Sequence, residues 1–342
     1  MNDTRVHAII LAHQKTGDFW ASAHTTLLRS SIGNFNQQQS LLEATIERIS
    51  CLIPHQRRWI ATTIEQEAVV VEKLGSLIAG VLIEPEEQGG VASMLFSALL
   101  IHESDPEAVL LFLPSTHQIV QPEKFLAFID HALDFVSTSD CITMVGVQPL
   151  YVTRDYNYLS YEIGNGLPGK FKKIYRSSDE GHLTHILRDK NCVWDTGIVL
   201  AKADVFIKAV EKVAPEVYAS VHEYVQGLGE YREVPAIPFS NIVEQIENIK
   251  IFPIDCIWQD VAAITASVTT GLESQIGQTD NYIEIDSHNN LIEAEGHLVA
   301  LVGVENLCVI KKDDIVLVVH RDHIQKVKQV IDELKKGREK YV

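Results

Sequence analysis

The sequence predicts an α/β fold in which a mostly parallel sheet with helices on both faces forms a large first domain, residues 1–272, followed by a small β-rich second domain, residues 273–342. Two observations carry this prediction. Up to about residue 270, apolar β-rich runs alternate with longer stretches of helical periodicity, which is typical of βαβ units. Beyond that point the pattern changes to short alternating strands separated by polar turns.

The first-domain elements follow from this periodicity. Ser40 and Glu43 form a capping box at the start of the first predicted helix. Pro114 and Pro149 each stop a strand at the carboxyl edge, where open α/β sheets bind ligands. Strands are expected at 6–12, 57–62, 78–83, 108–113, 141–147 and 196–201, and helices at 40–50, 64–75, 91–103, 122–137, 203–214 and 240–247.

The second domain is expected to hold strands at 297–303, 306–310 and 314–319 and a terminal helix at about 322–337. A turn cluster occupies residues 286–290. About 70 residues bury little apolar surface alone, so these strands should pack on the first domain or on a second subunit. We therefore expect a dimer.

Composition limits the partners. The chain has 342 residues, a formal net charge of −17 and five cysteines without a C-x-x-C pair. The acidic balance argues against nucleic acid and against anionic membrane surfaces. An odd number of scattered cysteines fits a reducing compartment. Because we see neither a leader-type apolar region nor an apolar run of spanning length, we expect a cytoplasmic protein.

The turn after the first strand carries the strongest functional signal. A buried strand at this place usually leads into a glycine-rich loop whose backbone N–H groups hold phosphates. Here one glycine remains, and an acid stands where a triphosphate favours a cation. The positions of this nucleotide loop are Ala12, His13, Gln14, Lys15, Gly17, Asp18 and Trp20.

Several short sequence motifs, called landmarks below, follow one another along the chain. They are Ile10-Leu11-Ala12, Ser40-Leu41-Leu42, Glu47-Arg48-Ile49, Ile83-Glu84-Pro85, Phe112-Leu113-Pro114-Ser115-Thr116-His117, Tyr156-Asn157-Tyr158-Leu159, Trp194-Asp195-Thr196-Gly197, Trp258-Gln259-Asp260-Val261 and Leu298–Val304. In this order and spacing the chain resembles the bacterial mannose-1-phosphate guanylyltransferases. The resemblance implies a Rossmann-like nucleotidyltransferase domain followed by a left-handed β-helix-like domain that often helps form dimers.

The resemblance also implies a reaction: a sugar-1-phosphate attacks the α-phosphorus of GTP and releases pyrophosphate with the assistance of Mg²⁺. Such chemistry depends on positioning and on charge neutralisation. It implies a base and sugar pocket formed by Glu84, Pro85, His117, Tyr158, Arg176, Trp194, Asp195 and Gly197. The resemblance implies two aspartates that bind the metal. Asp260 matches one of them, and Thr116 stands at the position of the other.

The chain departs from the family pattern where charge matters. When the family's loop motif is aligned with this chain, three of its glycines and its arginine are replaced by other residues. At the metal site, Thr116 is a poor Mg²⁺ ligand compared with a carboxylate. Structural readings also stand: His117 as a residue satisfied by backbone hydrogen bonds, Asp260 as a cap or loop acid, and Trp194 and Gly197 as packing and turn residues.

Two functions remain open. The first is a catalytically impaired member that senses a nucleotide or sugar-phosphate ligand, as a homodimer or in complex with an active paralogue. The second is an active sugar-1-phosphate nucleotidyltransferase, of the GDP-mannose type, with a rebuilt phosphate site. The residue chemistry favours the first.

Overall fold

The computed structural model divides into two compact units, one holding the strands up to Trp258 and the other the C-terminal strands. The predicted boundary at 272/273 falls outside the described residues and stays a prediction. The structure describes residues 5–12, 41–86, 88, 90–119, 121–149, 156–164, 166–176, 191–256, 258–260, 282–288, 290–294, 297–312 and 315–320.

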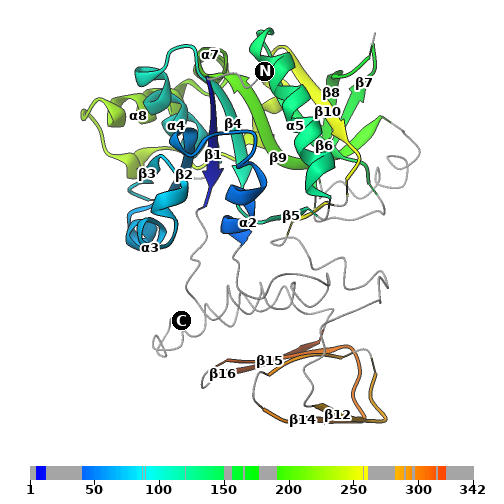
Figure 1. Ribbon diagram of the computed structural model, residues 1–342. Coiled ribbons are helices and arrows are strands. Elements are labelled where there is room, and N and C mark those ends of the chain that lie inside the picture. The colour runs from blue at the N-terminus through cyan, green and yellow to red at the C-terminus, as the bar shows by residue number, and fades with distance from the viewer. Residues whose placement is uncertain are drawn as a thin grey trace. The chain divides into compact units, whose positions relative to one another are not determined.

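A nine-stranded sheet forms the centre of the first unit (Figure 1). Its order is β3 (Gly80–Glu84), β2 (Arg58–Thr63), β1 (Val6–Leu11), β4 (Val109–Pro114), β9 (Cys192–Lys202), β6 (Ile142–Val147), β10 (Ile249–Ile254), β8 (Gly169–Tyr175) and β7 (Tyr158–Glu162). The α/β class is confirmed. Strands β3, β2, β1 and β4 are parallel, as are β6 and β10. The sheet as a whole is mixed, because β9 runs antiparallel to β4 and β6 and because β7 and β8 pair antiparallel.

Helices cover both faces of this sheet. They are α2 (Leu41–Arg48), α3 (Ile64–Leu74), α4 (Gly90–Ser104), α5 (Pro122–Ser137), α7 (Ala203–Val213) and α8 (Pro215–Val225). Helices α4, α7 and α8 share one core with Ile9, Phe112 and Met144 of the sheet. Alternate strand residues face the opposite side, where α5 lies in front of the strands in Figure 1 and buries one stripe, Phe125 to Val136. Among the described residues, no helix is long and apolar enough to cross a membrane.

Some predicted elements differ from the structure. The helix expected at 240–247 is wrong: residues Phe239–Asn241 and Val243–Gln245 form two 3₁₀ turns. Their buried side chains, Phe239, Ile242, Val243 and Ile246, keep a helix-like spacing, but the segment ends at Asn248, which has a φ of 60°. The chain also forms β7, β8 and α8, which the sequence analysis did not assign. The predicted helix at 322–337 lies outside the described residues.

The second unit consists of short strands that coil. Strand β12 (Tyr282–Ile285) pairs in parallel with β14 (Val299–Val302), and β13 (Leu291–Glu293) with β15 (Leu307–Lys312), which β16 (Ile315–His320) joins antiparallel. Asn290 fixes the turns between coils: its amide donates to Glu284 Oε1 (2.9 Å) and to the Val304 carbonyl (3.1 Å), and its Oδ1 accepts from the Leu307 N–H (2.9 Å). Parallel pairing between successive coils is the arrangement expected of a β-helix.

Candidate functional site

The carboxyl edge of the sheet brings the end of β1 together with the turn after β4. The Ser115 N–H donates to the Leu11 carbonyl (3.2 Å), and the Ala12 N–H donates to the Ala61 carbonyl (2.8 Å). Thr116 therefore lies in a turn next to the strand that leads into the predicted nucleotide loop. Of the loop positions, Ala12 is described and buried; His13, Gln14, Lys15, Gly17, Asp18 and Trp20 lie outside the described residues.

The turn continues into β5 (His117–Ile119), which pairs with β11 (Trp258–Asp260). His117 is 2% exposed, and its ring meets the Trp258 ring edge-on at 5.1 Å between centroids. Burial, together with the nearby Arg48 charge, lowers the pKa of His117 to about 3. A histidine held neutral inside an aromatic contact fits the structural reading better than a role as acid or base. Of Asp260, the backbone alone is described.

Three aromatic rings form a buried cluster beside His117. Tyr156 contacts both Trp194 (5.2 Å between centroids) and Trp258 (5.0 Å). Trp194 is on β9, directly opposite Tyr158 of β7, which is fully buried. The pocket residues Trp194 and Tyr158 thus lie together with His117. Tyr156 and Trp258 were missed as site residues, although both stand in the landmarks of the sequence.

An irregular segment of β9 shapes the adjacent part of the edge. Gly197 has a φ of +69°, and a Cβ there would lie 3.3 Å from Pro114 Cγ. The Asp195 carboxylate accepts the Gly197 N–H (2.9 Å), and the Thr196 hydroxyl donates to the Val145 carbonyl (2.7 Å). Burial raises the pKa of Asp195 to about 6. These contacts place Asp195 and Gly197 next to the end of β4. Their role in a pocket stays a prediction.

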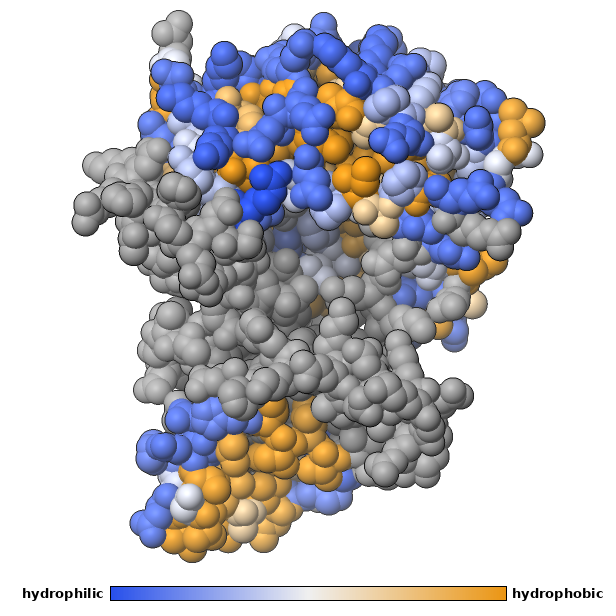
Figure 2. Space-filling model, turned by 180° about the vertical axis from the view of Figure 1, so that it is seen from behind, coloured by the Kyte–Doolittle hydropathy of each residue, from blue (hydrophilic) through white to orange (hydrophobic). Residues whose placement is uncertain are grey.

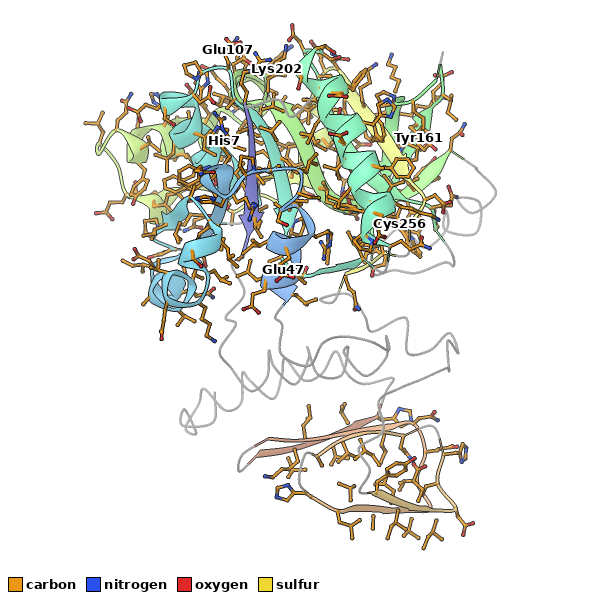
Figure 3. The ribbon with its side chains drawn as sticks, in the orientation of Figure 1. His7, Glu47, Glu107, Tyr161, Lys202 and Cys256 are labelled. Carbon is orange, nitrogen blue, oxygen red and sulfur yellow. The ribbon has the colours of Figure 1, made fainter. Side chains whose placement is uncertain are left out.

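Arg48 is a charged residue of this edge that the sequence analysis did not assign to the site. It ends α2, donates from Nη2 to the His117 carbonyl (3.0 Å) and lies over the Phe125 ring of α5, 5.8 Å from the centroid. Desolvation lowers its pKa to about 10, which leaves it charged at neutral pH. Its neighbour Glu47 and the nearby Cys256 are labelled at this edge in Figure 3. The signal in the sequence was the landmark Glu47-Arg48-Ile49.

The remaining residues of the predicted pocket, Glu84, Pro85 and Arg176, make their contacts elsewhere in the first unit. Glu84 is wholly buried and accepts hydrogen bonds from Tyr231 Oη (2.6 Å) and from the Ser93 hydroxyl. Its carboxylate joins β3 to α4 and to the 3₁₀ turn of Tyr231, and Pro85 follows it in a bend. Arg176 forms an ion pair with Glu244 (3.7 Å). The structure does not bring Glu84 or Arg176 into contact with the aromatic cluster.

The donor set fits Mg²⁺ poorly. Within the described part of the chain, no three His, Cys, Asp or Glu side chains gather in a group that could hold a metal ion. The predicted pair consists of a hydroxyl, Thr116, and one carboxylate, Asp260, whereas Mg²⁺ favours carboxylates and phosphate oxygens. No catalytic step is therefore derived through a metal.

Comparisons with known proteins support the resemblance. Residues 280–334 match the MannoseP isomerase/GMP-like beta-helix domain. The chain is 25% identical to Mannose-1-phosphate guanylyltransferase 2 of Escherichia coli O157:H7, over 98% of this chain and 74% of that protein. It is 23% identical to the Xanthan biosynthesis protein XanB of Xanthomonas campestris pv. campestris, over 87% of this chain and 67% of that protein.

A solved structure from Thermus thermophilus, named mannose-1-phosphate geranyltransferase, has the same fold. It superposes with a TM-score of 0.79 at 21% identity and covers 97% of this chain and 99% of that one. The resemblance to the mannose-1-phosphate guanylyltransferases is confirmed, and the α/β fold with a C-terminal β-helix domain is confirmed with it.

Proposed function

We propose that this chain, a mannose-1-phosphate guanylyltransferase-like protein, binds a nucleotide or sugar-phosphate ligand at the carboxyl edge of its sheet. It acts there as a ligand-sensing or regulatory subunit of sugar-nucleotide metabolism, with impaired transfer activity. Similarity to the Escherichia coli relative over 98% of the chain supports the ligand class. The residues at the carboxyl edge of the sheet support the proposal that transfer activity is impaired.

One observation carries the proposal. The turn that contains Thr116 is hydrogen-bonded to the end of β1 through Ser115 and Leu11 (3.2 Å). A metal carrying a triphosphate would be needed at this junction, yet the turn offers a hydroxyl in place of a carboxylate, and the loop that follows β1 carries Asp18 in place of a cation. Removal of one electrostatic stabiliser commonly lowers a rate by about 10²–10³, so several losses together leave little turnover.

Asp195 adds to this argument. Its pKa of about 6 leaves the carboxylate mostly ionised at pH 7. A negative charge within about 4 Å of a phosphate costs on the order of 4 kcal/mol at an effective dielectric constant near 20. The carboxylate still accepts hydrogen bonds from sugar hydroxyls, so recognition of a sugar is compatible with weak binding of its phosphate.

The proposed assembly is a homodimer or a complex with an active paralogue. The second unit exposes large apolar side chains, which Figure 2 shows gathered over its strands. They include Ile283, Ile285, Leu298 and Val302. Ile283 and Ile285 are on β12 and Val302 is on the paired β14, so the exposed apolar positions recur on neighbouring strands. A continuous apolar face of this kind is typical of an interaction surface.

A coupled pyrophosphate assay tests the impairment. Purified protein is incubated with GTP, mannose-1-phosphate and Mg²⁺, and calorimetry measures the binding of each compound separately. We expect heat of binding without GDP-mannose formation. Steady turnover that Asp260→Asn abolishes would instead establish the active nucleotidyltransferase. Absence of binding by GTP, GDP-mannose and mannose-1-phosphate would contradict both functions.

A restoration experiment locates the defect. Replacing residues 13–18 with Gly-Gly-Lys-Gly-Thr-Arg should create or strengthen GTP binding, because glycine allows close backbone approach to phosphate. Turnover should require Thr116→Asp in addition, because two carboxylates hold the metal better than one. The matched control carries Thr116→Asp alone. A graft that folds with unchanged melting and gains no affinity would show that the loop is not the site of the defect.

A further inference from the structure

Arg48 uses few of the hydrogen bonds that its guanidinium can make. A guanidinium has five N–H donors, and among the described residues one of them meets an acceptor, the carbonyl of His117 (3.0 Å). The Phe125 ring covers one face of the group (5.8 Å). The side chain is partly buried. Its remaining donors are not among the buried polar atoms that lack a partner, so they are accessible to a ligand.

The two arginines at the other edge of the sheet provide a reference. Arg58 donates to three carbonyls, those of Ile53 (2.7 Å), Ser50 (3.1 Å) and Leu77 (3.2 Å). Arg57 pairs with the Asp105 carboxylate (3.0 Å). A carboxylate therefore compensates the charge of Arg57, and three acceptors meet the donors of Arg58. Among the described residues, Arg48 has neither a carboxylate partner nor more than one acceptor.

No acid compensates the charge of Arg48 in the described part of the chain. Burial raises the pKa of the nearby Cys256 thiol to about 11, so the thiol is neutral at pH 7. The Phe125 ring belongs to the first turn of α5, which begins at Pro122 and carries both Glu123 and Lys124. The amino end of a helix carries a partial positive charge. Among the described residues, the charge of Arg48 therefore has no ion-pair partner.

The position of Arg48 points to the ligand. Its carbonyl acceptor belongs to His117, the residue after Thr116, and the same turn is bonded to the end of β1. We propose that Arg48 is an anion-binding residue of this edge and that its free donors hold a phosphate group. The choice of a ligand-borne phosphate rests on the proposed function; the anion site itself rests on the geometry of Arg48. Planar N–H pairs of arginine match phosphate oxygens in a bidentate fashion.

Calorimetry with inorganic pyrophosphate and with GTP tests the inference. The full-length chain is compared with Arg48→Gln, which removes the charge, and with Arg48→Lys, which keeps the charge and loses the planar fork. Arg58→Lys is the matched control, because it alters a satisfied arginine at the opposite edge. We expect Arg48→Gln to weaken pyrophosphate binding at least tenfold, as loss of one charge-assisted contact does. Arg48→Lys should lie between Arg48→Gln and the wild-type chain, and Arg58→Lys should bind as the wild-type chain does.

A purely structural role gives a different result. If Arg48 only fastens β5 through the His117 carbonyl, Arg48→Gln lowers the melting temperature while pyrophosphate affinity stays within about twofold of wild type, and the inference is overturned. Should Arg48→Gln fail to fold, Arg48→Lys decides alone by the shift in melting temperature that pyrophosphate produces. An unchanged shift contradicts the inference.

The outcomes separate this inference from the proposed function. Binding of pyrophosphate that depends on Arg48, without binding of GTP, GDP-mannose or mannose-1-phosphate, supports the anion site and contradicts the proposed function. Binding of GTP that Arg48→Gln leaves intact supports the function and overturns the anion site. A wild-type chain that binds no phosphate compound overturns both.

Discussion

The two edges of the central sheet differ in whether their charged side chains have partners within the protein. At the amino edge, His7, Arg57 and Asp105 form a closed network: Asp105 Oδ2 lies 3.2 Å from His7 Nε2 and accepts from Arg57 Nη1 (3.0 Å), while Trp59 Nε1 donates to His7 Nδ1 (3.0 Å). At the carboxyl edge, Arg48 has one carbonyl partner among the described residues. Figure 3 labels His7 near the first edge, and Glu47 and Cys256 at the second.

This difference indicates that the amino edge contributes to the stability of the fold, whereas the carboxyl edge is available to bind a ligand. A network in which every charge has a partner holds strands together and offers nothing to a ligand. Charges that lack partners, and carboxyls with perturbed pKa values such as Asp195, weaken a fold and are concentrated where ligands bind. The charges at the carboxyl edge therefore have the electrostatic character expected of the proposed binding site.

The largest expected effect is at the amino edge. Asp105→Ala leaves Arg57 and His7 without their acid and should lower the free energy of unfolding by about 2–4 kcal/mol. Glu107→Gln is the control, because its ion pair with Arg5 (3.7 Å) is exposed and should contribute less than about 1 kcal/mol. Urea unfolding followed by circular dichroism measures both. Equal losses would show that the network is not stabilising.

The pH dependence of stability should reveal the same network. Burial lowers the pKa of His7 below 6.5 in the folded state, so the unfolded chain binds its proton first. The stability that His7 contributes is present above pH 6.5 and is lost as pH falls toward its folded pKa. The difference in unfolding free energy between wild type and His7→Gln should accordingly shrink as pH falls below about 6.5. A constant difference across this window would refute the assignment.

Gly197→Ala is expected to have a smaller effect, at the carboxyl edge. The φ of +69° disfavours a side chain, and the new Cβ would approach Pro114 Cγ at 3.3 Å. The cost is about 1–2 kcal/mol. Gly227→Ala is a matched control with a φ of +73° and no atom within 4 Å of the new Cβ. Thermal melting should rank Gly197→Ala as the more damaging change; the reverse order would mean that the contact with Pro114 is unimportant.

The smallest expected effect is that of Asp195→Asn. Because burial raises the pKa of Asp195 from 3.8 to about 6, the folded state holds its proton more tightly than the unfolded state. Wild type should lose stability from this group as pH rises from about 4 to about 6. The shift corresponds to about 3 kcal/mol, which solvent screening at this partly exposed carboxylate reduces to on the order of 1 kcal/mol. The asparagine variant lacks this loss, so its free energy of unfolding should increase relative to that of wild type over the same pH range. Parallel stability curves for the two proteins would exclude a raised pKa.

Periodicity identified most elements of the first unit. The apolar stripe of 122–137 and the strand at 6–12 were correct to within a residue. The sequence could not specify strand direction, because an apolar run reads the same in both directions, and the antiparallel direction of β9 went unrecognised. The helix expected at 240–247 failed because apolar positions spaced by about three residues are compatible with 3₁₀ turns as well as with an α-helix.

The site residues stay a prediction. The resemblance implied a pocket that includes His117, Trp194, Asp195 and Gly197, and the structure places these residues near the ends of β4 and β5. Glu84 matched a landmark yet faces Ser93 and Tyr231, since a motif gives the identity of a residue and not the direction of its side chain.

The sequence by itself determined most elements of the first unit, the resemblance to the guanylyltransferases and the loss of the loop glycines, because periodicity and residue identity are local properties of the chain. The tertiary structure alone decided which charges have partners. Arg48 reaches a carbonyl 69 positions away, and Asp105 reaches His7 across 98. Contacts over such distances depend on how the strands and helices pack, and no local pattern distinguishes an arginine that packing satisfies from one whose donors it leaves free.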